Sequence, residues 1–248
     1  MLKLENVSKR YARGNVRAVD GLTLEVRGGE VFGFIGPNGA GKTTTIKLVT
    51  GILTPDEGTV TVGGAPLDKD PIAAKRMVGY VPDAQDAYDR LTGLEYLNFM
   101  CDMYGVSSAD RAARITSLSE RFELAAALNG IVKGYSRGMR QKLALIGALA
   151  HNPPLWILDE PMVGLDPRAA HVIKRQMRAH CAAGNTVFFS THVLDVAERL
   201  CDRIGILQKG KLIAVGTLDE LRSGETGASL EKVFLELTGD EAAGDWDE

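Results

Sequence analysis

The sequence GPNGAGKT, residues 36–43, lies between the apolar run 31–35 and a segment of helical character, 44–49. A glycine-rich turn between a buried strand and a helix is typical of a phosphate-binding loop, because glycines let backbone N–H groups converge. The helix N-terminus adds partial positive charge. Lys42 supplies a cation for the outer phosphates, and the Thr43 hydroxyl is placed to bind Mg²⁺. The predicted nucleotide site consists of Gly36, Pro37, Asn38, Gly39, Ala40, Gly41, Lys42, Thr43 and Thr44.

The length and composition bound the class of protein. With 248 residues, of which 45 % are hydrophobic, we expect either one domain of ordinary size or one with a small inserted subdomain. The net charge is −3, and the last eleven residues carry five acids and no bases, so the rest of the chain has a formal charge of +2. A nearly neutral body does not favour nucleic-acid binding, which usually needs a basic face.

Cysteine usage and hydropathy indicate the compartment. Cys101, Cys181 and Cys201 are odd in number and form no CxxC pair, which fits a reducing compartment. The sequence shows no signal peptide, and no apolar run approaches the roughly 18 residues that span a bilayer. We therefore expect any contact with a membrane to be made through a partner.

Alternating strand-like and helical segments predict an α/β fold with a largely parallel sheet. Short strands near the N-terminus, at 2–10, 19–26 and 59–62, are expected to form an antiparallel sheet beside it. Only helical spacing is found from 94 to 150, which predicts a helical subdomain inserted at about 84–152. The acidic tail, 239–248, has no periodicity and is expected to be disordered.

A pair of carboxylates ends the apolar segment LWILDE, residues 155–160. A lone Asp-Glu pair after a strand is often a solvated loop start. Beside a phosphate loop, however, Asp159 can hold a metal through water and Glu160 can reach the γ-phosphate side. Glu160 has the reach of a general base that polarises the attacking water. The sequence therefore predicts hydrolysis rather than nucleotide binding alone.

A second glycine-containing turn is found in YSRGMRQ, residues 135–141. Ser136 as an N-cap and Gly138 in the first turn leave N–H groups free, and Arg137 and Arg140 add positive charge. Taken alone, the segment fits an ordinary capped amphipathic helix as well as an anion site.

Four motifs in this order resemble those of the ATP-binding subunits of ABC transporters, over about residues 1–225. They are GPNGAGKT, YSRGM, ILDEP followed by Gly164-Leu165-Asp166, and Ser190-Thr191-His192. The resemblance implies a RecA-like P-loop NTPase core with an N-terminal antiparallel β-subdomain and an inserted α-helical subdomain. After this domain, the sequence predicts a short C-terminal helix at 226–238. The resemblance also implies that two such domains associate head to tail, with each ATP between one phosphate loop and the other subunit's Ser136–Gly138 turn.

The resemblance assigns further roles. Tyr11 matches the aromatic residue that stacks on adenine, although by spacing it is an ordinary aromatic at a strand end. Asp166 matches the loop that links the two sites of the dimer. His192 matches the histidine that contacts the γ-phosphate, whereas a lone histidine after a strand is usually structural.

Two departures from the family pattern stand out. Asp83, after Pro82, occupies the place of a common glutamine; it is a candidate metal or water ligand on a shorter arm, or simply a turn residue. Gln85, two residues on, cannot substitute without a shift of the loop. The signature also differs from LSGGQ, because Tyr135, Arg137 and Met139 replace its Leu, first Gly and Gln.

The combination of Pro82-Asp83, LTGLEYL at 91–97 and YSRGMRQKL at 135–143 is most similar to bacterial ABC-2-type export ATPases. That resemblance implies ATP and Mg²⁺ as cofactors, a homodimer or heterodimer of ATPase subunits, and a separate integral membrane permease at the cytoplasmic face of the cell membrane. Two alternatives remain open. A soluble ABC-type mechanical ATPase of translation or DNA repair usually carries two ATPase units, and a P-loop small-molecule kinase would not need Ser136–Gly138. The transported substrate is not encoded in any motif of this chain.

Overall fold

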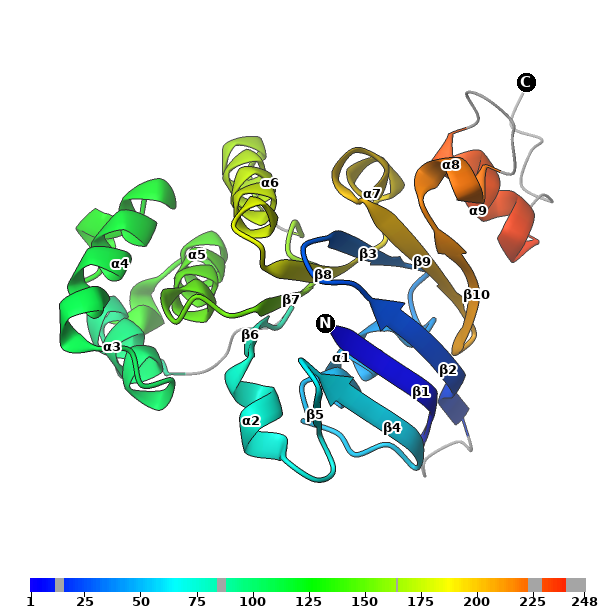
Figure 1. Ribbon diagram of the computed structural model, residues 1–248. Coiled ribbons are helices and arrows are strands. Elements are labelled where there is room, and N and C mark those ends of the chain that lie inside the picture. The colour runs from blue at the N-terminus through cyan, green and yellow to red at the C-terminus, as the bar shows by residue number, and fades with distance from the viewer. Residues whose placement is uncertain (12–15, 84–87, 164, 223–228, 240–248) are drawn as a thin grey trace, which may run out of the picture.

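The main sheet of the computed structural model has six strands in the order β10-β9-β3-β8-β7-β6 (Figure 1). The structure describes residues 1–11, 16–83, 88–163, 165–222 and 229–239. Every neighbouring pair in this sheet is parallel except β9 and β10, which form an antiparallel hairpin. The strands are β3 (Val31–Ile35), β6 (Val78–Val81), β7 (Leu155–Asp159), β8 (Thr186–Thr191), β9 (Arg203–Gln208) and β10 (Lys211–Gly216).

The central strands of this sheet are buried on both faces, as their continuous apolar sequences predict. Alternate side chains enter different cores. Leu155 and Ile157 pack with Phe188 on one face, whereas Trp156 packs with Phe189 on the other. The predicted, largely parallel sheet is thus confirmed.

A second sheet of four antiparallel strands, in the order β2-β1-β4-β5, covers one face of the first. The core between the sheets contains Phe188, whose ring centroid lies 5.8 Å from that of Phe32 and 5.4 Å from that of Phe34. This arrangement confirms the predicted antiparallel subdomain. Its strands are β1 (Leu2–Tyr11), β2 (Val16–Val26), β4 (Glu57–Val62) and β5 (Ala65–Pro66).

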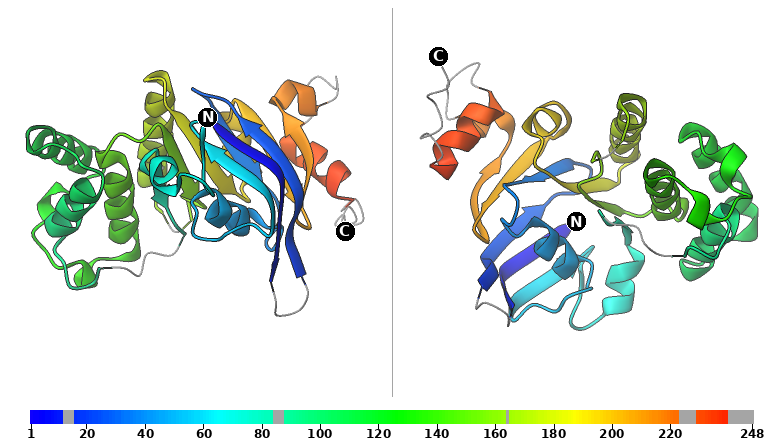
Figure 2. Two further views of the ribbon diagram at one scale, coloured as in Figure 1. Left: turned by 60° about the horizontal axis from the view of Figure 1, so that its bottom comes forward. Right: turned by 180° about the vertical axis from the view of Figure 1, so that it is seen from behind.

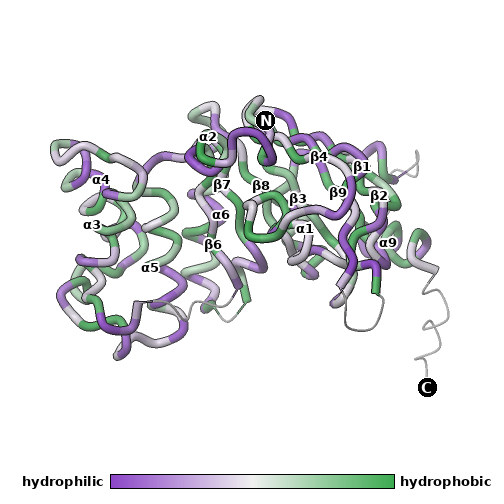
Figure 3. Tube along the Cα trace, turned by 90° about the horizontal axis from the view of Figure 1, so that it is seen from below, coloured by the Kyte–Doolittle hydropathy of each residue, from purple (hydrophilic) through white to green (hydrophobic). Residues whose placement is uncertain are grey.

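Three helices stand to one side of the sheets, as Figure 2 also shows. They are α3 (Gly93–Met103), α4 (Ser108–Arg121) and α5 (Arg137–Ala150), and two 3-10 turns, Ala125–Ala127 and Val132–Gly134, lie between α4 and α5. Leu97, Cys101, Ile115 and Leu145 bury their apolar faces against one another. Hydrophobic residues follow the central strands, whereas the outer turns of α4 are largely hydrophilic (Figure 3).

Four of the remaining helices connect strands, and α8 and α9 follow the last strand, β10. They are α1 (Lys42–Val49), α2 (Pro71–Arg76), α6 (Pro167–Ala182), α7 (Leu194–Leu200), α8 (Leu218–Leu221) and α9 (Leu230–Thr238). Sequence periodicity does not reveal α2, because six residues are too few, although Asp70 caps it and Pro71 opens it. In the described part of the chain, no helix combines the length and hydropathy needed to cross a membrane. Gln85, Gly164 and the acidic tail after Gly239 lie outside the described residues.

His151, which follows α5, is stacked on Tyr104 with ring centroids 3.6 Å apart. Burial lowers the pKa of His151 from 6.5 to about 4. In the unfolded chain the imidazole takes up a proton near pH 6.5, whereas in the folded chain it stays neutral until about pH 4. The unfolded state therefore binds more protons between these values, and stability is lost as the pH falls through this window.

We expect the free energy of unfolding to fall by about 2 kcal/mol between pH 7 and pH 5 through His151 alone. Urea unfolding at both pH values measures this change. The variant His151→Gln should lose this part of the pH dependence, and His171→Gln, at an exposed position of α6, should keep it. Equal pH dependence in wild type and His151→Gln would contradict the assignment.

Candidate nucleotide site

The sheet brings the predicted site residues to one edge. The phosphate loop follows β3, Asp159 and Glu160 come at the end of β7, and His192 directly follows β8. Strands β3, β8 and β7 are parallel neighbours, so their carboxyl ends meet at the same edge. Such an edge, outside the carboxyl ends of parallel strands, is where α/β proteins bind ligands.

The phosphate loop depends on glycines at two close approaches. A Cβ atom at Gly36 would lie 2.3 Å from the Leu207 carbonyl oxygen, and one at Gly41 would lie 2.2 Å from that of Ala18. Gly41 also has φ 109°, in the left-handed region, and is the N-cap of α1. No side chain among the described residues caps this helix. Its first N–H groups are therefore available to an anion.

Lys42 is folded back over the loop and is only 6 % exposed. Its Nζ donates hydrogen bonds to the carbonyl oxygens of Gly36, at 2.7 Å, and Pro37, at 3.2 Å. The same ammonium lies 3.5 Å from Glu160 Oε1. A buried cation is thus held beside the N–H groups of α1, where phosphate oxygens would need it.

The carboxylate of Glu160 lies between the ammonium group of Lys42 and the imidazole ring of His192. Its Oε1 faces Lys42, and its Oε2 is 3.0 Å from His192 Nδ1. The backbone has φ 48°, which is uncommon for a residue other than glycine, and its N–H donates to Ser190 Oγ at 3.0 Å. The side chain is 13 % exposed, so the carboxylate is fixed in direction yet reachable by water.

Asp159 is buried and accepts a hydrogen bond from Ser190 Oγ at 2.6 Å. Burial raises the pKa of Asp159, the charges of Asp83 and Glu160 raise it further, and hydrogen bonds from Ser190 and Thr43 oppose the rise. The Asp159 carboxylate and the Thr43 hydroxyl are hard oxygen donors of the kind that a divalent cation prefers. Among the described residues, no group of three His, Cys, Asp or Glu side chains is arranged to hold a metal ion. A cation at this place would therefore need further ligands, such as phosphate oxygens.

Ser190 is the site residue whose role the sequence does not reveal. Its hydroxyl donates to Asp159 and accepts from the N–H of Glu160, so it holds the two carboxylates in their relative positions. The available signal is a serine that follows the apolar residues Val187, Phe188 and Phe189 within a buried strand.

Tyr11, Ser136 and Asp166 each lie at the end of a strand or the start of a helix. Tyr11 ends β1, and its hydroxyl is 3.4 Å from Thr44 Oγ1. Ser136 caps α5 by accepting the N–H of Met139 at 3.2 Å, and Asp166 caps α6 by accepting that of Ala169 at 2.9 Å. The bond from Ala169 is the main reason why the pKa of Asp166 is lowered. Tyr11 is thus beside the phosphate loop.

The signature turn makes no direct contact with the loop of its own chain. Ser136 is exposed, and among the described residues no hydrogen bond or ion pair joins Ser136 or Gly138 to the phosphate loop. Arg137, between them, lies 3.9 Å from Asp83 Oδ1. Asp83 thus faces both the site carboxylates and the inserted helices.

Residues 19–163 match the protein family described as ABC transporter. The chain belongs to this family. Among curated ABC relatives, it is 38 % identical over 234 residues to the Nod factor export ATP-binding protein I of Cupriavidus metallidurans, covering 94 % of this chain and 77 % of that protein.

Solved structures of the ABC family agree. An ATP-binding subunit of an ABC transporter superposes with a TM-score of 0.91 at 37 % identity, covering 96 % of this chain and 99 % of the other. A dimeric ATP-binding cassette in a post-hydrolysis state, bound to ADP and Pi, has a TM-score of 0.80 at 29 % identity, covering 88 % and 99 %. The chain is accordingly an ATP-binding and ATP-hydrolysing subunit of this family, and the kinase and mechanical-ATPase alternatives are not favoured.

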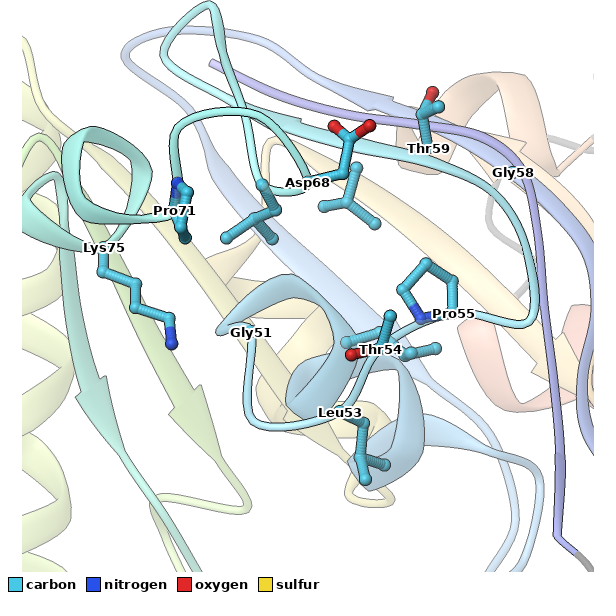
Figure 4. Close-up of a pocket in the computed structure, with 12 residues that line it drawn as sticks. Gly51, Leu53, Thr54, Pro55, Gly58, Thr59, Asp68, Pro71 and Lys75 are labelled. Carbon is cyan, nitrogen blue, oxygen red and sulfur yellow. The ribbon is translucent and has the colours of Figure 1, made fainter.

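A hollow of about 320 Å³ lies at the opposite end of α1 from the phosphate loop of this ABC subunit (Figure 4). Its lining includes Leu48, Leu53, Val60 and Leu67, with Lys75 at one side. An eight-residue helix is about 12 Å long, so this hollow is separate from the phosphate site.

Proposed function

We propose that Glu160 is the general base of ATP hydrolysis in this subunit, and that the subunit acts in a pair to drive export through a separate membrane permease. The observation that carries the proposal is the position of Glu160, with one oxygen facing Lys42 and the other hydrogen-bonded to His192. A carboxylate held in this way next to a phosphate cradle suits the activation of water.

In this mechanism the N–H groups of α1 and the Lys42 ammonium bind the outer phosphate oxygens and stabilise the charge of the transferring phosphoryl group. Glu160 accepts a proton from the attacking water, whose oxygen bonds to the γ-phosphorus as the bond to the leaving oxygen of ADP breaks. His192 orients the carboxylate of Glu160. Mg²⁺ would be held by Thr43, Asp159 and Asp83, and when bound it neutralises phosphate charge.

The other half of each ATP site would come from a second ATPase subunit, either a copy of this chain or a related one. The exposed Ser136–Gly138 turn has no partner in its own phosphate loop, and its helix start suits the γ-phosphate of a neighbouring ATP. Tyr11 would stack on adenine, and Asp166 would lie between the two sites. The dimeric relative described above supports this arrangement.

The permease would contact an aromatic surface, here called the α3 surface, formed by Tyr88, Tyr96, Phe99 and Met103. Tyr88 lies 5.3 Å from Tyr96 and 5.5 Å from Phe99, centroid to centroid, and Met103 is 65 % exposed. Exposed aromatic and methionine side chains of this kind mark protein interfaces. The subunit would thus sit at the cytoplasmic face of the cell membrane, and the name of the Nod factor export relative favours export.

The variant Phe99→Asp tests this contact, because a charge in the middle of an apolar interface costs affinity. We expect wild-type chain, expressed in its own cells, to sediment with membranes and Phe99→Asp to be at least about tenfold depleted there. Leu235→Asp, at a similarly exposed leucine on α9, is the matched control and should sediment like wild type. Undiminished membrane association of Phe99→Asp, with normal ATP binding, would refute the α3 surface as the docking site.

A further inference from the structure

A second groove, of about 370 Å³, lies between α4, the end of α5 and α6. None of its lining residues belongs to the phosphate loop or to the strand ends at the nucleotide site. Successive turns of α4 and of α6 form its two walls. The lining residues are Ala113, Arg114, Ser117, Leu118, Arg121, Leu149, Asn152, Gln176 and His180.

The helices around this α4–α6 groove carry an excess of positive charge. Within their bounds, α5 and α6 together contain seven Lys or Arg residues and no Asp or Glu, although the whole chain has a net charge of −3. Four of these seven are paired with acidic side chains: Arg137 with Asp83, Arg140 with Asp89, Arg168 with Glu123 and Arg178 with Asp202. An anion in the groove therefore has to be recognised by the side chains that line the groove itself.

Arg121 offers the groove a largely unused guanidinium. Its Nη1 donates to Gln176 Oε1 at 3.4 Å, and within the described chain no carboxylate lies within 4.0 Å of it. Arg114, about two turns earlier on the same helix, is more occupied: its Nη1 donates to the Ala150 carbonyl oxygen at 3.2 Å, and its Nη2 is 3.7 Å from Asp110. Arg121 is thus the cation with the most free donors for a ligand.

His180 adds an acceptor to the same groove and is only 5 % exposed. Its Nε2 lies 2.9 Å from the Pro153 carbonyl oxygen, and because a carbonyl only accepts, Nε2 carries the proton. Burial lowers the pKa of His180, so the ring is neutral near pH 7 and Nδ1 is an acceptor. The groove thus combines guanidinium donors with an imidazole acceptor over the apolar floor of Leu118 and Leu149.

We propose that the α4–α6 groove binds a small anionic metabolite, bearing a phosphate or carboxylate together with a hydroxyl, with Arg121 as its principal contact. The volume suits a small molecule rather than a protein segment. Arginine forks match both oxyanions, and a ligand hydroxyl can donate to His180 Nδ1. Since α4 belongs to the inserted helices and α6 packs on the main sheet, the bound anion joins these two parts of the fold.

Calorimetric titration tests the proposal on full-length protein whose nucleotide site is saturated with Mg-ADP. The probes are glycerol 3-phosphate, malate and, as the uncharged comparison, glycerol. We expect one saturable site per chain for at least one anionic probe, and the preferred probe identifies the anion class. The variant Arg121→Gln should weaken binding at least tenfold. Arg168→Gln removes an exposed arginine that is paired with Glu123 outside the groove, and it should bind like wild type.

A second variant distinguishes the loss of a ligand contact from a loss of folding. Gln176→Glu places a carboxylate against Arg121 and should also weaken binding at least tenfold, while the melting temperature without probe stays near that of wild type. The proposal is overturned if neither anionic probe binds wild type saturably, or if Arg121→Gln and Gln176→Glu bind as wild type does. Binding only to phosphatidylglycerol vesicles, and to neither small probe, would also overturn it, because a membrane surface would then be the ligand.

Discussion

The variant Glu160→Gln is expected to hydrolyse ATP at least about 10²-fold more slowly than wild type, because a glutamine amide cannot accept the proton of the attacking water. The substitution preserves the size of the side chain, and the backbone bond to Ser190 is unaffected. ATP binding should persist, since the N–H groups of α1 and the Lys42 ammonium remain. Release of inorganic phosphate under saturating Mg-ATP measures the rate.

The control for this prediction is Glu57→Gln, at an exposed glutamate that begins β4. It has the same chemistry at a distance from the site, and it should hydrolyse ATP like wild type. If Glu160→Gln and Glu57→Gln both retained the wild-type rate, Glu160 would not be the base.

The second large effect is expected for Lys42→Ala, which should weaken ATP binding by about 10²-fold. A charge-assisted hydrogen bond to phosphate contributes up to about 3 kcal/mol, and among the described residues no second lysine donates a hydrogen bond to the loop. Calorimetric titration with Mg-ATP measures the affinity. The matched control, Lys47→Ala, removes a lysine from the last turn of the same helix and should bind normally. Undiminished affinity in Lys42→Ala would remove the basis for placing phosphates at this loop.

Local sequence signals were sufficient for much of the fold. The continuous apolar runs of β3 and β7 identified buried strands, and GPNGAGKT identified the turn into α1, because each signal is contained within a few neighbouring residues. The cap at Ser136 was predictable for the same reason. By contrast, α2 and β5 were missed, since elements of six and two residues are too short to show a periodicity.

The contacts that define the site are long-range, and the sequence shows them only as separate residues. Ser190 is hydrogen-bonded to Asp159 and Glu160, which lie 31 and 30 positions before it in the sequence. The pairing of Lys42 with Glu160 depends on the strand order β3-β8-β7. Arg137 and Asp83 both differ from the common pattern of the family, and the ion pair between them joins positions that are far apart in the sequence. Strand order and side-chain direction decide such pairs, and neither can be read from spacing.

In the proposed hydrolytic ATP site, Glu160 acts as the base and a second subunit closes over the nucleotide. The most direct measurement is the identity of the nucleotide retained by Glu160→Gln after incubation with Mg-ATP, analysed together with the mass of the complex by light scattering. The predicted result is intact ATP held in a complex of dimeric mass, whereas wild type under the same conditions yields ADP and phosphate. Conversion of ATP to ADP by Glu160→Gln at the wild-type rate would contradict the account.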